Sequence, residues 1–565
     1  MASRPSLTLA LITDTHVRPP FDDGQRAFPS DQDHNARNAE AATVVRTFGA
    51  DAIVHLGDVV HPIPTLPSHQ AALDVAAQTW GTLGVPLLVV AGNHDVGDKR
   101  TSINAPILAA EARVAFERQW GKTWRRVDLH GVRLLVVDGG LLGLDSPEAL
   151  AQAAWLEATL AEPDHRTFVF THYPPFLCDP DEAEHYDNLP PETRLWLLDR
   201  LADAGVEAVF SGHVHRFFYN RYRGIDLYTL PSVAFVRPEY SGLRPVPPMD
   251  IENGRDDRPH LGVSRLVIDA DGHRLEVMRL HTDAAGRWSA PRPLGTWLRT
   301  RLGRRAEIPY GDLDALTRKE ARDDAALLAV RDLGLSRVRL PLADLADPAV
   351  RDRLAWLARA GVGVSVFSGG LPTPSQAAQA EGMEAWEVVV RPSDVPALAA
   401  RLAEWSGPGL TLGRIGRPWT GDGEAPTYFS HFPRQGFDAG DPAVDTLVQA
   451  AAAGAVARVA FRIAAEGPVE AQVAAAVGHA ARLGVGATLH VELPFETEAV
   501  RQTDDARVTE RVLAADRAAW AHPDAHVFLD LLYDKDRGYY CRNALVDGAD
   551  RPRAAYAALK RAGKG

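Results

Sequence analysis

Five short motifs contain side chains that bind divalent metal ions: Asp14-Thr15-His16, Gly57-Asp58, Gly92-Asn93-His94-Asp95, Thr171-His172 and Gly212-His213-Val214-His215. Carboxylate oxygens, imidazole nitrogens and an amide oxygen suit Mn, Fe, Zn, Ni or Co. The candidate ligands outnumber the needs of one ion, and they are Asp14, His16, Asp58, Asn93, His172, His213 and His215. The motifs therefore predict a centre of two divalent metal ions, whose identity the residue types leave open.

Each motif follows an apolar, strand-like run, so we expect all five at one edge of a sheet, where loops converge. Each motif alone is weak, but five in succession at strand ends are improbable as coincidence. Alternation along an extended strand would turn Asp14 and His16 to one face, and likewise His213 and His215. A glycine precedes three of the ligands and allows tight turns.

The order D-x-H, G-D, G-N-H-D, H, G-H-x-H over residues 5–280 resembles the calcineurin-like metallophosphoesterase superfamily. The form with Asp14 and His16 on the first strand is similar to bacterial class III cyclic nucleotide phosphodiesterases and glycerophosphodiesterases. The resemblance implies one metal held by Asp14, His16, Asp58 and His215, and a second held by Asp58, Asn93, His172 and His213. It also implies that His94 is not a metal ligand but an acid that stabilises or protonates the leaving oxygen, and that Asp95 orients His94. We further expect His94 and Asn93 to bind substrate.

This resemblance predicts a phosphodiesterase that hydrolyses a small phosphodiester. A hydroxide that bridges two divalent ions is available at neutral pH, and the ions neutralise the phosphate oxygens during in-line attack. The metal site alone does not choose among phosphate esters, so a phosphomonoesterase or a nucleotide pyrophosphatase of the same superfamily is the nearest alternative. A carbohydrate-directed protein, in which the C-terminal half binds or cleaves a sugar-containing substrate, is the alternative from another class.

Alternating strand-like and helix-like segments predict two α/β domains in the 565 residues. We expect a four-layer metallophosphoesterase sandwich, two sheets flanked by helices, over residues 1–283, and a linker over 284–311, where periodicity weakens. Residues 312–565 show seven strand-like runs, most followed by an amphipathic segment. They predict a (β/α)8-barrel with one strand that the sequence does not place, and an open doubly wound sheet competes with it.

The predicted barrel loosely resembles those of glycoside hydrolases, and it carries Glu492, Asp530 and Asp534 at strand ends. Glu492 and Asp530 lie on successive candidate strands, which is compatible with paired-carboxylate hydrolysis. Acids at barrel ends commonly pair with arginine, however, so we expect substrate recognition or dimerisation, and hence a homo-oligomer, rather than catalysis there.

Several neighbouring residues have two interpretations. His55 lies within an apolar run, which favours a buried structural role. The polar segment 31–38 is either a solvated loop or a substrate contact, and Tyr173, Tyr219 and Tyr222 either line a pocket or pack in the core.

The composition excludes other classes of function. The net charge is −13 and no Lys/Arg run forms a basic stripe, so we expect a small phosphoester as substrate and no nucleic acid polymer. No run approaches the length of a membrane span, and we expect no membrane partner and no export signal. Only Cys178 and Cys541 are present, which favours a reducing, cytoplasmic location.

Overall fold

The computed structural model describes residues 6–24, 26–99, 110–163, 165–244, 252, 255–280, 289–308, 317–379, 381–416, 434–494, 505–534 and 543–562. The chain forms two compact units and passes between them more than once. Unit 1 comprises Met1–Arg287 and Arg304–Ala325, and unit 2 comprises Trp288–Gly303 and Ala326–Gly565.

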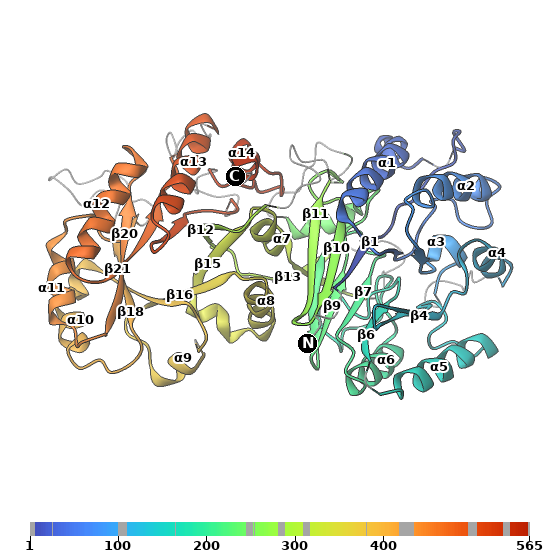
Figure 1. The fold of residues 1–565 in the computed structure, drawn as a ribbon, viewed down its shortest axis with the longest axis horizontal. Helices are drawn as coiled ribbons and strands as arrows, with labels where there is room; N and C mark the ends of the chain where they lie inside the picture. Colours follow the sequence, from blue (N-terminus) through green and yellow to red (C-terminus); the bar gives the residue numbers. More distant parts are fainter. Residues whose placement is uncertain are drawn as a thin grey trace. The chain divides into compact units, whose positions relative to one another are not determined.

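Unit 1 contains two mixed sheets (Figure 1). The first sheet, in the order β11-β10-β1-β2-β3, consists of β1 (Leu7–Ile12), β2 (Ala52–His55), β3 (Leu87–Val89), β10 (Gly262–Asp269) and β11 (Gly272–Arg279). The second, in the order β4-β5-β6-β7-β9-β8, consists of β4 (Arg125–Leu129), β5 (Val132–Val136), β6 (Arg166–Phe170), β7 (Ala208–Ser211), β8 (Phe218–Tyr222) and β9 (Ile225–Thr229). Strands β1, β2 and β3 run parallel to one another, as do β5, β6, β7 and β9.

Helices cover these sheets and complete the predicted sandwich of two sheets flanked by helices (Figure 1). They are α1 (His34–Val45), α2 (His69–Trp80), α3 (Asn93–Val96), α4 (Ala110–Trp120), α5 (Pro147–Leu160) and α6 (Pro191–Asp203). Among the described residues, the 3-10 turns η1 (Pro29–Asp33), η2 (Arg46–Phe48) and η3 (Pro238–Leu243) accompany them.

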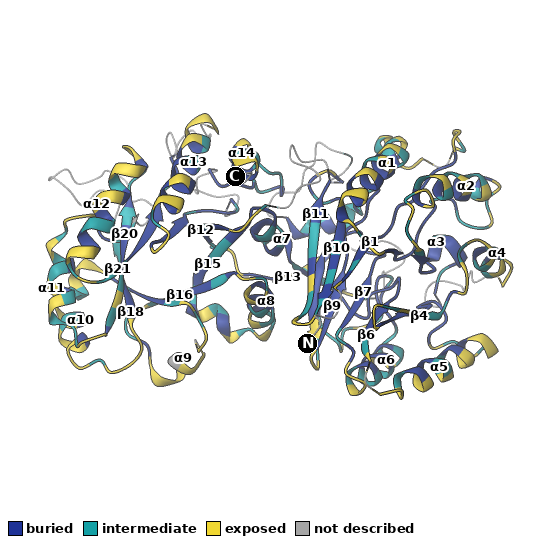
Figure 2. Ribbon diagram, viewed as in Figure 1, coloured by how far each residue is buried: buried dark blue, intermediate teal, exposed yellow. Residues whose placement is uncertain are grey.

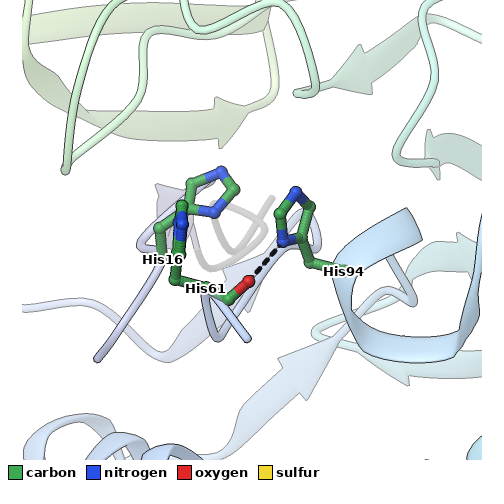
Figure 3. Close-up of side chains that lie close together, drawn as sticks. All are labelled: His16, His61 and His94. Atoms are coloured by element: carbon green, nitrogen blue, oxygen red, sulfur yellow. Dashed lines mark hydrogen bonds between the residues drawn. The ribbon is translucent and has the colours of Figure 1, made fainter. Parts of the chain in front are cut away.

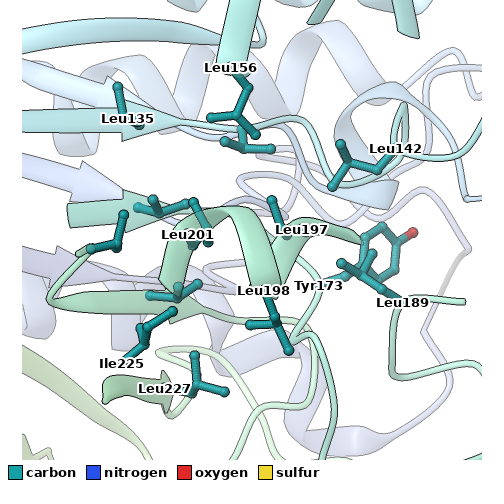
Figure 4. Packing of buried hydrophobic residues seen from close by; sticks show 14 of the residues in the cluster. Leu135, Leu142, Leu156, Tyr173, Leu189, Leu197, Leu198, Leu201, Ile225 and Leu227 are labelled. Carbon is teal, nitrogen blue, oxygen red and sulfur yellow. The ribbon is translucent and has the colours of Figure 1, made fainter. Parts of the chain in front are cut away.

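The core under the second sheet is built by leucines of α6 (Figure 4). Leu197, Leu198 and Leu201 lie on one face of this helix and are fully buried, together with Leu156 of α5. Each such side chain contributes roughly 1.5–3 kcal/mol through burial. Figure 2 shows the consequence, since the strands are largely buried while the outward face of α5 is exposed.

Unit 1 also contains a hairpin that comes from a later part of the sequence. Strands β13 (Arg304–Ile308) and β14 (Lys319–Asp323) pair antiparallel. Ile308 and Ala321 pack in one buried cluster with Val214, which lies between His213 and His215. The hairpin therefore supports the back of a candidate metal-binding motif.

Unit 2 is a closed barrel of eight parallel strands, as predicted. They are β12 (Arg292–Trp297), β15 (Leu335–Pro341), β16 (Gly363–Gly369), β17 (Ala385–Val390), β18 (Leu410–Gly416), β20 (Val456–Ile463), β21 (Gly486–Val491) and β22 (His526–Leu529). The order is β17-β16-β15-β12-β22-β21-β20-β18, and the pairing of β17 with β18 closes the barrel and rules out the open sheet. A two-residue strand, β19 (Arg434–Gln435), pairs antiparallel with β18.

A helix follows each barrel strand in the chain. The helices are α7 (Ala325–Asp332), α8 (Pro348–Arg359), α9 (Pro374–Gln379), α10 (Val395–Leu402), α11 (Pro442–Ala450), α12 (Val469–Arg482), α13 (Asp505–Ala521) and α14 (Ala554–Ala562). The 3-10 turns η6 (Leu342–Ala346) and η7 (Pro392–Asp394) precede α8 and α10.

The predicted linker at 284–311 is wrong in its described part. Residues 284–288 lie outside the described residues, but β12 is the barrel strand that the sequence did not place, and β13 belongs to unit 1. The predicted domain limits at 283 and 312 therefore differ from the limits of the two units, which fall after residues 287, 303 and 325. The sequence pattern of a strand is weak in β12 because this strand contains Gly295. An added Cβ at Gly295 would lie 2.8 Å from Arg337 Cβ and 2.8 Å from Phe528 Cδ1. Close packing of the barrel thus requires a residue that weakens the strand pattern.

The acids at the barrel's strand ends are all paired with arginines. These pairs are Glu492 with Arg462, Asp530 with Arg299, and Asp534 with Arg553. The arrangement favours a structural role for these carboxylates over paired-carboxylate hydrolysis.

Two further expectations concern membranes and thiols. Within the described ranges, no helix combines the length and the apolar character that crossing a bilayer requires. Cys178 is a buried free thiol, while Cys541 lies outside the described residues.

Candidate metal centre

Five of the predicted ligands adopt a left-handed backbone. The φ angles are 49° at Asp14, 39° at His16, 54° at Asp58, 68° at His213 and 63° at His215. Non-glycine residues rarely occupy this region, and such strain concentrates at functional sites. Asp14 and His16 lie beyond the end of β1, so strand alternation is not what brings them together, contrary to our expectation.

Backbone hydrogen bonds align the turns after β1 and β2. The N–H of Asp14 donates to the Gly57 carbonyl and that of His16 to the Asp58 carbonyl, each at 3.0 Å. Gly57 has φ 101°, and an added Cβ would lie 2.6 Å from His172 Nδ1. The glycine therefore allows two ligand-bearing loops to approach each other, as the sequence predicts.

The first predicted ligand set forms one buried cluster. Ligand atoms of Asp14, His16, Asp58 and His215 all lie within 4.8 Å of one another. His215 Nε2 is 3.2 Å from Asp14 Oδ1 and 3.2 Å from His16 Nε2. These four side chains can hold one cation.

The second set shares Asp58 with the first. Ligand atoms of Asp58, His172 and His213 also lie within 4.8 Å of one another. Asn93 Oδ1 is 3.1 Å from His172 Nε2 and 3.0 Å from His213 Nδ1. The structure thus brings together all seven predicted ligands, with Asp58 in both groups.

The imidazoles are oriented as metal-binding histidines are. Three of them donate an outward ring N–H to a backbone carbonyl: His172 Nδ1 to Leu56 at 2.8 Å, His215 Nδ1 to Phe235 at 2.9 Å and His213 Nε2 to Tyr186 at 3.3 Å. Each bond leaves the lone pair of the other nitrogen directed into the cluster. The donor set and its outer hydrogen bonds therefore fit two divalent ions.

His94 lies at the rim of the centre, beside His16 and His61 (Figure 3). Its backbone N–H donates to Asp58 Oδ1 at 2.8 Å, and its Nδ1–H donates to the His61 carbonyl at 2.6 Å. The rings of His16 and His94 meet edge to face with centroids 4.7 Å apart. Ligand atoms of His16, His61 and His94 also lie within 4.8 Å of one another, so these three side chains form a further group of potential metal ligands beside the two predicted clusters.

Asp95 does not orient His94, and this part of the prediction is wrong. The Asp95 carboxylate accepts backbone N–H groups of Asp58 at 2.8 Å, Val59 at 3.0 Å and Gly92 at 2.9 Å. It therefore holds together the turns that carry Asp58 and Asn93, while the His61 carbonyl orients His94. Burial and the nearby Asp58 charge raise the pKa of Asp95 to about 7.

Burial and mutual charge set the protonation of the ligands. Burial lowers the pKa of His16 well below its ordinary value, and the neighbouring His94 and His215 lower it further. Burial opposes ionisation of Asp58, but His172 and His94 outweigh it and lower the pKa of this carboxyl. His16 is thus neutral and Asp58 ionised at neutral pH, the forms that bind metal.

Burial would lower the pKa of His172, but the charge and hydrogen bond of Asp58 raise it to about 9. His172 must therefore lose a proton to act as a ligand.

The sequence analysis missed two residues behind His213. Asp187 is fully buried, and its Oδ1 lies 3.5 Å from His213 Nε2. Asp187 also accepts hydrogen bonds from Lys319 Nζ at 2.6 Å and Tyr240 Oη at 2.8 Å, and it pairs with Arg237. Tyr186 Oη accepts from Asn93 Nδ2 at 3.4 Å. The only sequence signal was a polar, aromatic stretch between β6 and α6.

The residues with two interpretations now have defined positions. His55 is buried on β2, and its Nε2 lies 2.9 Å from Thr15 Oγ1, which fits the structural role. In the segment 31–38, His34 Nδ1 donates to the His16 carbonyl at 3.1 Å, so this segment supports the centre from behind. Tyr173 and Tyr219 are fully buried.

The comparisons with known proteins agree with this geometry. Residues 7–217 match the sequence model of the family described as calcineurin-like phosphoesterase, so the chain contains a calcineurin-like phosphoesterase domain. The predicted resemblance is confirmed over that range.

Among curated relatives, the serine/threonine-protein phosphatase CPPED1 of Danio rerio is 35% identical over 190 residues, which are 32% of this chain and 59% of that protein. The glycerophosphodiester phosphodiesterase GpdQ of Enterobacter lignolyticus is 29% identical over 41% of this chain and 79% of that protein. A probable cyclic nucleotide phosphodiesterase of Pseudoalteromonas is 25% identical over 41% of this chain and 80% of that protein. The chain spans little more than half the length of the CPPED1 relatives that it matches.

Proposed function

We propose that the protein is a phosphoesterase dependent on two divalent metal ions, and that it hydrolyses a small phosphodiester. The observation that carries this proposal is the pair of buried ligand clusters that share Asp58. One ion would be held by Asp14, His16, Asp58 and His215, and the other by Asp58, Asn93, His172 and His213. Two such ions supply Lewis acidity and a nucleophile at neutral pH.

His94 is the proposed acid. Because Nδ1–H is engaged by the His61 carbonyl, Nε2 carries a transferable proton only when the ring is an imidazolium. In that form Nε2–H protonates the leaving oxygen while Nδ1–H stays bonded to the backbone. The same contact fixes the ring plane, so the acid is oriented before substrate binds.

Two variants separate metal binding from acid catalysis. Asp58→Ala removes the carboxylate common to both clusters, so bound Mn and activity are lost together. His94→Ala keeps bound Mn, measured by elemental analysis after desalting, but loses most turnover of an ester with a poor leaving group. Full activity of His94→Ala on that ester would overturn the acid assignment.

Diester preference is tested with bis-p-nitrophenyl phosphate against p-nitrophenyl phosphate in the presence of Mn. The similarity to GpdQ supports the diester. The similarity to CPPED1, which is named a phosphatase, supports a phosphomonoesterase as the second candidate. A higher kcat/KM for the monoester would favour the second candidate, and cleavage of neither ester would contradict both.

A further inference from the structure

The interior of the barrel contains an unusual layer of polar side chains. Arg339 on β15 donates through Nε to Glu387 Oε2 on β17 at 2.8 Å, and His490 Nε2 on β21 lies 3.1 Å from the same oxygen. These strands are not neighbours in the barrel, so the contacts cross its interior. Barrel interiors of this type are normally filled by Val, Ile and Leu.

Three neighbouring strands present hydrogen-bond donors at one level of this interior. Trp297 on β12 is in register with Arg339, and Arg339 is in register with Ser365 on β16. Arg339 is 1% exposed and Ser365 is 4% exposed. Among the residues that the structure describes, Arg339 Nη1 and Nη2, Ser365 Oγ and Trp297 Nε1 are buried without a hydrogen-bond partner. Buried polar groups left unpaired are costly, so a set of four in one place indicates a ligand.

A cavity adjoins this layer on the side of the strands' carboxyl ends, where barrels of this type bind their ligands. It has a volume of about 560 Å3, and Phe367, Val389 and Ile415 line it. Phe367 lies two positions beyond Ser365 and Val389 lies two positions beyond Glu387, so each faces the same side as that residue one layer higher. The Phe367 ring also contacts the Arg339 guanidinium, whose Cζ is 4.0 Å from the ring centroid.

We propose that the barrel binds a small organic carboxylate, with its carboxylate on Arg339 and its body in the cavity. Glu387 occupies Nε of Arg339, which leaves Nη1 and Nη2 as a parallel pair that matches the two oxygens of a carboxylate. Ser365 Oγ and Trp297 Nε1 supply two further donors. Because Glu387 already balances part of the arginine charge, a singly charged group fits better than a dianionic phosphate. Most of the residues that line the cavity are apolar and suit a hydrocarbon body, although Arg391, Asp394, Arg401 and Gln435 also line it.

The test uses the full chain and acids paired with their neutral amides: acetate with acetamide, succinate with succinamide, and phenylacetate with phenylacetamide. Isothermal titration gives the Kd and a thermal shift gives the stabilisation. We expect at least one acid to bind saturably and its amide to bind tenfold or more weakly. Binding of inorganic phosphate and of glucose is measured in the same way, because these compounds represent the competing classes of ligand.

Ser365→Ala and Trp297→Phe each remove one unpaired donor and break no protein hydrogen bond, and Trp297→Phe keeps an aromatic ring beside Arg299 and Arg339, so both variants should remain folded. The affinity for the acid should fall about tenfold in each variant. Arg517→Gln is the matched control, because Arg517 on α13 is not among the residues that line the cavity and pairs with exposed Glu470. It should change the Kd less than threefold. Binding that is equal in Ser365→Ala, Trp297→Phe and the wild type, binding of phosphate or glucose instead, or binding of none of the acids would overturn the proposal.

Discussion

Lys319 is predicted to stabilise unit 1 through a buried ion pair. The ammonium donates to Asp187 Oδ2 at 2.6 Å, and the two side chains are 1% and 0% exposed. Burial opposes ionisation of Asp187, but Arg237 and Lys319 outweigh it and hold the pKa of this carboxyl well below its ordinary value. Replacing one partner of a buried pair typically costs about 3–5 kcal/mol. Because Arg237 and Tyr240 would still compensate Asp187, we expect about 2–3 kcal/mol for Lys319→Met.

The assay is differential scanning calorimetry of the full chain. A loss of that size should lower the Tm of the unit 1 transition by roughly 3–5 °C. The matched control is Lys122→Met, whose partner Glu117 lies 3.2 Å away and whose own side chain is 70% exposed. Such a surface pair contributes at most about 1 kcal/mol. A Tm for Lys319→Met within 1 °C of the wild type, or equal to that of Lys122→Met, would refute the assigned role.

Three more predictions concern packing and pH. Leu198→Ala should destabilise unit 1 by about 2–5 kcal/mol in urea unfolding, because Leu198 is fully buried, whereas Leu195→Ala, at a position 38% exposed, should cost far less. Gly295→Ala should destabilise the barrel by about 1–3 kcal/mol through overpacking, and an unchanged urea midpoint would contradict the close contact. Burial opposes ionisation of Glu387, but Arg339 outweighs it and lowers the pKa of Glu387 to about 2. This carboxylate therefore stabilises the barrel above pH 4.5, and its contribution is lost as the pH falls toward 2, so Glu387→Gln should remove that part of the pH dependence of unfolding.

The ligand-bearing motifs were predictable because each combines a chemically distinctive residue type with a position after an apolar strand. The order of the motifs along the chain then predicted the two clusters that share Asp58, but not the further group of His16, His61 and His94. What brings Asp14 and His16 together, however, is a pair of left-handed turns bonded to the next loop, and this conformation has no signature in a three-residue motif.

Other features were hidden for physical reasons. The groups that orient His94 and His215 are main-chain carbonyls, which every residue possesses. The hairpin β13–β14 reads Arg-Arg-Ala-Glu-Ile and Lys-Glu-Ala-Arg-Asp, so its charged residues mask the short apolar contact that anchors it. Asp187 acquires its role only from side chains distant in the sequence, among them Lys319.

The alternation of the chain between its two units constrains the order in which these units can fold during synthesis. The polypeptide changes unit three times, after residues 287, 303 and 325. During synthesis, the phosphoesterase unit stays incomplete until its hairpin has left the ribosome, although most of its sequence emerges earlier. The barrel in turn cannot close until β22 arrives to pair with β12, its first strand. Unit 1 therefore cannot be completed before residue 325 has been synthesised, nor the barrel before β22, and such long-range pairing is intrinsically slow. A gene divided at any single codon near residue 283 would encode a phosphoesterase half without the lysine that holds Asp187.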